Sequence, residues 1–280
     1  MSRLVLLPLF LALLITACDS NVMDDEDMMA MTTLRLEPVF DGQPLVMGST
    51  YTHNGTAINF SAARVYISDI TLIAEDGTET VIQSDPLTVP AKAADDSDVT
   101  HTVSNRVIFA KHDHAHHEYD LGHVPVGEYH GVEFNVGIAG TDNRIDATQV
   151  PASHPLAKQT DLNNHWSWSN GYIFVRLDGQ VDSDGDGTPD TAWETHLGKD
   201  NFLREVHLHA DFEVDQEGTT QIHVMLDYHK LLEGVDLADP VQRICHTGNN
   251  LPVANAVASE ISGSFMFHGV HDSDHDGHDH

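Results

Sequence analysis

The chain has 280 residues, of which 40% are hydrophobic, and it carries 44 acidic side chains against 13 lysines and arginines, for a formal net charge of -31. This apolar content is enough for a packed core and argues against a chain that is disordered throughout. The charge argues against a nucleic-acid partner, because neutralising phosphates needs clustered cations, and it favours a soluble surface that attracts cations.

The first segment, residues 1–17, is typical of a processing signal. One cation, Arg3, precedes the apolar run LVLLPLFLALLI, which is too short for a stable membrane-spanning helix. The letters ITAC then place small residues before Cys18, an arrangement that resembles a bacterial lipobox. We therefore expect a lipoprotein signal peptide, lipidation of Cys18, and an exported protein anchored at the periplasmic side of a bacterial membrane, inner or outer, or at the cell surface. The alternative is an ordinary secretory signal with an incidental cysteine.

The rest of the chain reads as one β-rich domain. Residues 18–32 are acidic and lack periodicity, which predicts a solvated tether. Beyond them, segments of alternating apolar and polar residues are separated by Gly, Asp, Asn and Pro; they are 33–40, 58–77, 78–83, 119–140, 171–179, 204–214 and 219–228. Many short strands at such spacing predict an all-β fold over residues 33–270, an antiparallel β-sandwich or a barrel-like domain. Short helices are expected only within 228–236 and 237–246, and a polar loop within 91–105.

Two tracts are rich in histidine. Residues 111–123 (KHDHAHHEYDLGH) hold His112, His114, His116, His117 and His123, and residues 268–280 (HGVHDSDHDGHDH) hold five more, interleaved with aspartate. Imidazoles at this density are typical of metal capture, and a flexible tract selects Cu²⁺, Ni²⁺ or Zn²⁺ by affinity order. We expect weak, exchangeable metal binding, with residues 271–280 forming a His/Asp-rich tail. The alternative is a solvated acidic tail.

The stretch DSDGDGTPD, residues 182–190, fits the alternating oxygen ligands of a calcium loop, with a glycine at the sharp turn. The template expects a glutamate where Trp193 stands, Glu194 comes one residue late, and no helix pair flanks the loop. We therefore expect a structural Ca²⁺ between two strands and no EF-hand, with an acidic hairpin turn as the alternative. The expected ligands are Asp182, Asp184, Asp186, Thr188 and Asp190.

Two further features concern single residues. His207 and His209 stand two apart in an expected strand and so face one side, where a third ligand from a neighbouring strand would complete an open copper or zinc site. Polar residues on the solvent side of a strand are the alternative. Cys245 has no cysteine to pair with if Cys18 is lipidated. It is interpreted as a small buried hydrophobe, with soft-metal ligation as the alternative.

The string HWSWSNGYIFVRLDG, residues 165–179, places two of the three tryptophans on one expected strand face beside His165. Such a pair by itself predicts ordinary packing. Together with HLG at 196–198, however, the string resembles the MbnP-type copper-binding proteins, exported β-rich proteins with a W-x-W-x-x-G-Y signature. PVFDGQPLVMGSTYTHNG, ARVYISDITLI, VPVGEYHGVEFNVGIAG, VMLDYHKLLEG and SEISGSFMFH follow in the family's order, so the likeness covers nearly all of 33–268.

The resemblance implies a copper site built around a modified tryptophan. In characterised members one signature tryptophan, matching Trp166 or Trp168, is oxidised to kynurenine by a partner MbnH-like dihaem cytochrome c peroxidase. The chemistry is sensible, because indole offers only an N–H donor whereas ring opening yields an amine and a ketone with lone pairs. His196 of the H-x-G element matches the companion ligand, and His165 stands where relatives often have Met.

The chain also departs from its relatives. Some carry a Cys shortly after H-x-G and another near the position of Met47, and both are absent here. The Asn-His that some relatives show is replaced near Asn143–Arg144, which puts a ligand from that loop in doubt and makes His154 the candidate substitute.

These patterns predict a tethered copper-binding protein for uptake, storage or delivery. It would be the substrate of a partner enzyme and not an enzyme, since nothing resembles a nucleophile–base pair or a phosphate-binding loop. Two other functions stay open: a lipoprotein that buffers divalent metals such as zinc or nickel, and a calcium-stabilised surface interaction module.

Overall fold

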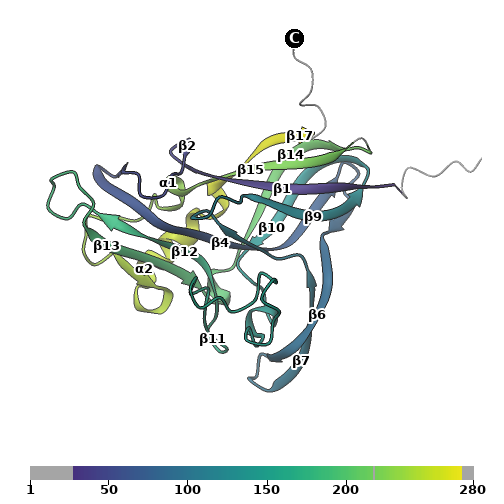
Figure 1. The fold of residues 1–280 in the computed structure, drawn as a ribbon, viewed down its shortest axis with the longest axis horizontal. Coiled ribbons are helices and arrows are strands. Elements are labelled where there is room, and N and C mark those ends of the chain that lie inside the picture. The colour runs from purple at the N-terminus through teal and green to yellow at the C-terminus, as the bar shows by residue number, and fades with distance from the viewer. Residues whose placement is uncertain (1–27, 217, 273–280) are drawn as a thin grey trace, which may run out of the picture.

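The computed structural model describes residues 28–216 and 218–272, which are built mostly of strands (Figure 1). The strands are β1 (Met29–Phe40), β2 (Gln43–Pro44), β3 (Tyr51–His53), β4 (Thr56–Ala74), β5 (Glu79–Val81), β6 (Gln83–Lys92), β7 (Asp98–Asn105), β8 (Ile108–Lys111), β9 (Glu118–Pro125), β10 (Gly127–Val136), β11 (His165–Ser167), β12 (Gly171–Val181), β13 (Thr191–Gly198), β14 (Arg204–Val214), β15 (Thr219–Asp227), β16 (Ile244–His246) and β17 (Phe265–Asp272). The helices are α1 (Tyr228–Leu231) and α2 (Leu251–Glu260), with short 3-10 helices η2 (Asp142–Arg144), η3 (Asp200–Phe202), η4 (Thr247–Asn249) and η5 (Ser262–Ser264). The predicted β-rich fold with short helices is confirmed.

The strands form two main sheets that enclose a common core as a β-sandwich. Among the described residues, one sheet has five strands in the order β17-β15-β1-β2, with β9 also paired to β1. The other has ten: β14-β10-β4-β12-β13-β16 form its path, β3, β5 and β8 pair with β4, and β11 pairs with β12. Most pairs are antiparallel, as predicted, but β1 with β15 and β13 with β16 are parallel. The second of these parallel pairs builds the candidate site.

Apolar side chains cover one face of the ten-stranded sheet and part of the other. On β14 buried and exposed residues alternate strictly, so that Val206 and Leu208 point into the main core. Strand β4 is buried on both sides, with Val65 in the main core and Tyr66 in a second apolar cluster on the opposite face. The segment before β11 supplies part of this second cluster, including Leu156. The chain that leads into the tryptophan motif is therefore packed against the outer face of the sheet.

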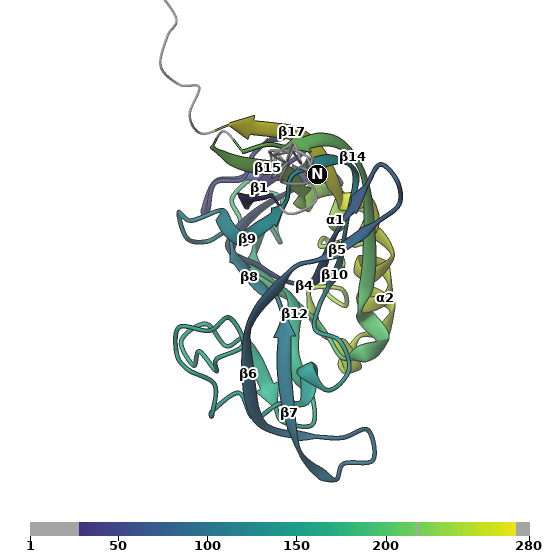
Figure 2. The ribbon, with the colours of Figure 1, turned by 90° about the vertical axis from the view of Figure 1, so that its right-hand side faces the viewer.

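Two expectations about local structure are wrong. Residues 91–105, expected as a loop, belong to a hairpin of β6 and β7 that projects from the body of the molecule (Figures 1 and 2). No helix forms in 237–246, where the Arg243 guanidinium donates to the carbonyls of Leu237 and Ala238 and holds the segment in turns before β16. The second helix is α2, which carries a proline in its first turn, where the missing N–H costs no helical hydrogen bond.

The ends of the domain differ slightly from the expected bounds. Strand β1 begins at Met29, inside the expected tether, because its first residues already pair with β9. Strand β17 runs to Asp272, two residues into the expected tail. The signal peptide, the lipidation site Cys18, residues 18–27 of the tether and residues 273–280 of the tail lie outside the described residues, so those expectations stay predictions. Within residues 28–272 no helix is long and apolar enough to cross a bilayer.

Candidate metal centre

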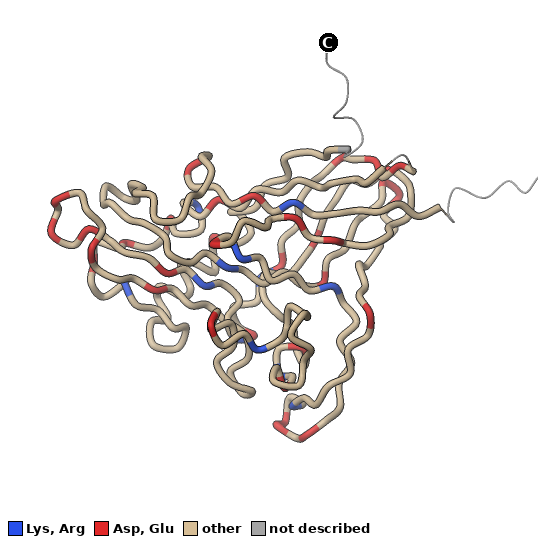
Figure 3. Tube along the Cα trace, in the orientation of Figure 1, with Lys and Arg blue, Asp and Glu red and all other residues tan. Residues whose placement is uncertain are grey.

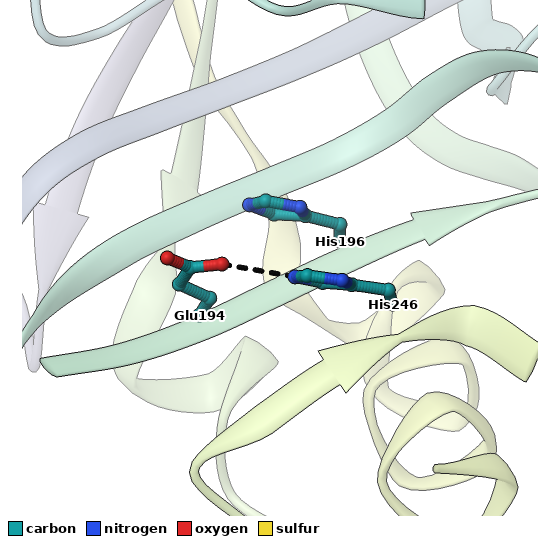
Figure 4. Close-up of side chains that lie close together, drawn as sticks. All are labelled: Glu194, His196 and His246. Atoms are coloured by element: carbon teal, nitrogen blue, oxygen red, sulfur yellow. Dashed lines mark hydrogen bonds and ion pairs between the residues drawn. The ribbon is translucent and has the colours of Figure 1, made fainter. Parts of the chain in front are cut away.

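Two histidines and a glutamate come together where β13 pairs with β16. The parallel register places His196 directly beside His246, and Glu194 lies two residues before His196 on the same face of β13. One ligand atom of each residue lies within 4.8 Å of the other two (Figure 4). Nε2 of His246 lies 2.9 Å from Oε2 of Glu194. The backbone pairing thus assembles a candidate metal site from segments about fifty residues apart.

The site is partly open. His196 is only 4% exposed, whereas the side chains of His246 and Glu194 are 43% and 40% exposed. Beside it, an open cleft of about 670 Å³ is lined by Glu194, Asp178 and Met47, among others. A metal ion therefore has a route from solvent past a carboxylate, while the inner imidazole stays protected from water.

Asp178 and Arg176, on the neighbouring strand β12, hold His196 in place. Asp178 accepts a hydrogen bond from Nε2 of His196 at 2.6 Å, and it accepts another from Nε of Arg176 at 2.8 Å. Arg176 also donates to the carbonyl of Asn163, just before β11. Burial disfavours the ionised form of Asp178, but the hydrogen bond from His196 and the charges of His196 and Arg176 outweigh it and hold the pKa of this carboxyl below its usual value. An anion is therefore fixed against the buried imidazole.

Trp166 is the signature tryptophan that reaches this strand face. A Cβ built on Gly198 would lie 2.6 Å from Cζ3 of Trp166 and 2.6 Å from the carbonyl oxygen of Tyr172. Gly198, His196 and Glu194 alternate along β13 and so share a side. The indole therefore lies over the same face as His196, two residues further along the strand. The glycine of H-x-G is explained by this close approach, since any side chain there would displace the ring.

Trp168 has different neighbours, so the expectation that both indoles share one strand face is wrong. Strand β11 ends at Ser167, and Trp168 lies in the turn that follows. Its Nε1 donates to the carbonyl of Arg144 at 2.6 Å, and Nζ of Lys92 lies 5.4 Å from its ring centroid. Trp168 therefore ties the motif to the loop at residues 142–145, away from β13.

That loop also explains the glycine of the signature. Gly171 has a positive φ of 70°, and a Cβ there would overlap the side chain of Asn143. Oδ1 of Asn143 accepts the backbone N–H of Tyr172 at 2.9 Å, and the Arg144 guanidinium pairs with Asp200. Asn143 and Arg144, which replace the Asn-His of some relatives, therefore have a structural role here.

His165 is buried but not joined to the His196 group. It is 7% exposed, and its ring packs edge-on against Tyr172 with centroids 4.8 Å apart. Neither ring nitrogen has a hydrogen-bond partner among the described residues. Burial, helped by the charge of Lys158, lowers the pKa of His165 to about 4. The imidazole therefore stays neutral, with its lone pair available, next to Trp166 in the chain.

The other predicted copper ligands lie elsewhere. His154 lines a separate cleft of about 380 Å³ with Arg106 and Tyr119, and its Nδ1 accepts the backbone N–H of Leu156. His207 and His209 stand on β14, four strands from β13 in the sheet order, which corresponds to roughly 20 Å. The structure therefore does not bring these three histidines to the site of Trp166 and His196.

The pair on β14 does find acidic neighbours. Nδ1 of His207 lies 2.8 Å from Glu133 on β10, and its Nε2 lies 3.3 Å from Glu205. These three residues have ligand atoms within 4.8 Å of one another but are largely exposed. The hydrogen bond that His207 donates to Glu133 raises the pKa of His207. His209 pairs with Asp211 at 3.5 Å. The predicted open site on this strand stays a prediction.

The histidine tracts are more ordered than the sequence indicated. Residues 111–123 form the end of β8, a turn and most of β9, and His112 is only 3% exposed. Nδ1 of His112 lies 2.6 Å from the hydroxyl of Tyr228, and burial, together with the nearby His117, lowers its pKa to about 3. His112 is therefore a core residue and not part of a flexible metal-capturing tract. In the second tract, His268 and His271 belong to β17.

The remaining two expectations concern the calcium loop and Cys245. Asp182, Asp184 and Asp186 gather within the β12–β13 loop, an acidic part of the trace in Figure 3, whereas Asp190 bonds to Ser183. Thr188 contributes its backbone N–H to Asp186. Calcium binding at this loop stays a prediction.

Cys245 is fully buried in the main core, as interpreted. Burial raises the pKa of its thiol. It points away from the strand face that carries His246, because neighbouring strand residues alternate.

Sequence reasoning missed three members of the site: Glu194, Asp178 and His246. The i, i+2 spacing of Glu194 and His196 in a strand is a signal that would have found the first. His246 was hidden because residues 237–246 were expected to be helical. Nothing local indicates Asp178, which reaches His196 only through the β12–β13 register.

The fold and the site define the class: a β-sandwich protein of the MbnP family, to which this chain belongs, since the sequence profile of that family matches residues 29–247. Among solved structures, the chain is similar to MbnP from Methylosinus trichosporium, at 18% sequence identity and a TM-score of 0.45, over 75% of this chain and 80% of that one. The search of curated proteins gave no match. The family resemblance predicted from the tryptophan motif is confirmed by the profile match.

Proposed function

We propose that this protein is an exported, membrane-tethered copper-binding protein for uptake, storage or delivery of the metal. Membership of the MbnP family supports a copper-related role. The observation that carries the proposal is the position of Trp166, whose indole lies against Gly198 on the strand face that also presents His196 and Glu194.

The donor set suits copper. Imidazole nitrogen is a ligand of Cu²⁺, and two imidazoles with a carboxylate offer two neutral ligands and one charge-compensating ligand. A metal needs the imidazole lone pair, so copper would replace the protons that His196 and His246 now share with Asp178 and Glu194. We propose that these two histidines hold the ion together with Glu194, and that the carboxylate of Asp178 adds a negative charge beside it.

We further propose that Trp166 becomes a ligand only after oxidation by a partner dihaem peroxidase. Two hydrogen peroxide molecules supply the two oxygen atoms that cleave the indole C2–C3 bond, giving N-formylkynurenine and two waters. Hydrolysis then releases formate and leaves kynurenine. The resulting aromatic amine and ketone have lone pairs that the intact indole lacks. The protein would thus be the substrate of this oxidation and not the enzyme.

Copper titration of the full-length protein tests the site. We expect His196→Ala and His246→Ala each to weaken the tightest Cu²⁺ site by at least about 10-fold, as is typical when the shell of a metal site is damaged. His101→Ala is the matched control, because His101, on β7, pairs with Asp142 and is not one of the three residues of the site. Unchanged affinity in both site variants, with intact folding by circular dichroism, would refute the proposal.

The same titration separates the two other functions. A lipoprotein that buffers zinc or nickel through its histidine tracts would bind several equivalents of Zn²⁺ and lose none of them in His196→Ala. A calcium-stabilised interaction module would unfold at lower temperature after chelation of Ca²⁺ and would respond little to copper.

A further inference from the structure

A second group of imidazoles lies on the outer face of the five-stranded sheet, far in sequence from the tryptophan motif. Along β15, residues at alternate positions are buried in the core or face outward, and His223 belongs to the outward set with Gln221 and Met225. His223 is nevertheless only 6% exposed. The rings that lie against it are those of His268 and His271, with centroids 4.8 Å and 5.6 Å away. An outward-facing histidine is thus covered by two others.

A β-bulge brings these rings together. Val224 pairs with Phe267 and His223 pairs with Gly269, so His268 is the extra residue in β17. In a regular strand His268 and His271, three residues apart, would face opposite sides. The bulge shifts the alternation by one residue, and Gly269, with φ of 126°, accommodates it. His268 and His271 therefore share the face of His223.

Glu37 fixes the orientation and the tautomer of the His223 imidazole. Oε2 of Glu37, on β1, accepts a hydrogen bond from Nε2 of His223 at 2.6 Å, while Arg35 lies 3.9 Å from the same oxygen. This fixes the tautomer with the proton on Nε2 and leaves the lone pair on Nδ1. Nδ1 of His223 is buried and has no hydrogen-bond partner within the described residues. A buried nitrogen without a partner is costly unless something occupies its lone pair.

We propose that His223, His268 and His271 form a second metal site, oriented by Glu37, for a divalent transition-metal ion that prefers imidazole, Cu²⁺ or Zn²⁺. Two imidazoles on one tetrahedral ion, with metal–nitrogen distances of about 2.1 Å, have ring centroids about 5 Å apart. The observed 4.8 Å and 5.6 Å are near this value for His223 with each partner, and the exposed rings of His268 and His271 would turn inward to bring all three nitrogens onto one ion. The three-histidine set leaves one coordination position open, so the ion is exchangeable with solvent ligands.

The test uses the full chain with His275, His278 and His280 replaced by asparagine, so that imidazoles of the tail do not contribute. Zn²⁺ and Cu²⁺ are titrated separately against a chromogenic competitor, and the Cu²⁺-loaded protein is examined by EPR. We expect one Zn²⁺ equivalent that is lost in the double variant H268A/H271A, and an affinity about 10-fold lower in Glu37→Gln. Both substituted histidines are exposed residues of β17, so we expect the double variant to fold. His223→Ala is the second variant, and thermal unfolding checks the folding of both.

His196→Ala and His101→Ala in the same background separate the two sites. This second site must survive His196→Ala, whatever happens to the tight copper site. His101→Ala is expected to change nothing. Failure of the background protein to bind either metal at this site, or full binding in H268A/H271A, would overturn the second site and leave the proposed copper function untouched.

Discussion

The imidazole of His196 lies parallel to that of His246, with ring centroids 4.6 Å apart and planes inclined by only 7° (Figure 4). Each ring has its Nε2 against a carboxylate, that of Asp178 or Glu194. Because the rings are stacked, the Nε2 atoms of His196 and His246 lie at the same end of the pair, next to Glu194 (Figure 4). A metal ion lies close to the plane of each imidazole it binds, so copper binding requires the two planes to tilt toward each other. The exposed ring of His246 is the one free to move.

The different neighbours of the two signature tryptophans predict which one is oxidised. With the partner peroxidase and hydrogen peroxide, peptide mass spectrometry should find kynurenine at residue 166 in the wild type and in Trp168→Phe, but at neither position in Trp166→Phe. The reason is that Trp166 lies on the face of His196, whereas Trp168 is held by Arg144. Kynurenine at residue 168 would contradict this assignment.

Adding a methyl group at Gly198 should damage both packing and copper binding. A Cβ there collides with Trp166 and with a backbone carbonyl, so we expect Gly198→Ala to lower the free energy of unfolding by about 1–3 kcal/mol, as in other overpacked sites. Copper affinity should fall as the indole is displaced. Gly248→Ala is the control, because its Cβ would meet only the end of Lys199 at 3.7 Å. Equal unfolding curves for the two variants would exclude a close approach at Gly198.

Removing the charge of Asp178 should weaken metal binding more than folding. Asp178→Asn keeps an oxygen that accepts from His196 but loses the anion that favours a nearby cation. We expect copper affinity to fall by about 10-fold or more, typical of a lost carboxylate–histidine contact. Copper titration and urea unfolding of the same samples measure both effects. An affinity equal to that of the wild type would show that Asp178 does not support the site.

His112 predicts a loss of stability in acid. Its folded pKa of about 3 lies below the ordinary value of 6.5, so the unfolded chain binds a proton first as the pH falls. This contribution to stability is complete above about pH 6.5 and shrinks by about 1.4 kcal/mol per pH unit below it. In His112→Phe the unfolding free energy should fall less steeply between pH 6 and 4, by the amount that corresponds to the uptake of one proton on unfolding. The Tyr228 hydroxyl, which loses its partner, lowers the stability of this variant at every pH. Urea unfolding at several pH values measures the slope, and an unchanged slope would contradict a neutral buried His112.

The sequence by itself determined the class of fold and the family. Alternation of apolar and polar residues has a period of two in a strand with one solvent-exposed face, so strands such as β14 and β15 could be predicted directly from the sequence. The motifs W-x-W-x-x-G-Y and H-x-G each lie within one short stretch of strand and turn. They can therefore be recognised in the sequence without knowledge of how distant segments pack. The glycines at 171 and 198 carried a signal because only glycine tolerates their conformation or close contacts.

Only the tertiary structure decided which side chains meet. A parallel strand pair brings His246 beside His196, and a β-bulge brings His268 beside His223. Neither contact can be predicted from the local periodicity of the sequence. Only the structure shows that Trp166 and Trp168 have different neighbours, and that His112 is buried in the core. The physical reason is that strand periodicity fixes which face a side chain takes, whereas the neighbour on that face depends on register with a strand that is distant in the chain.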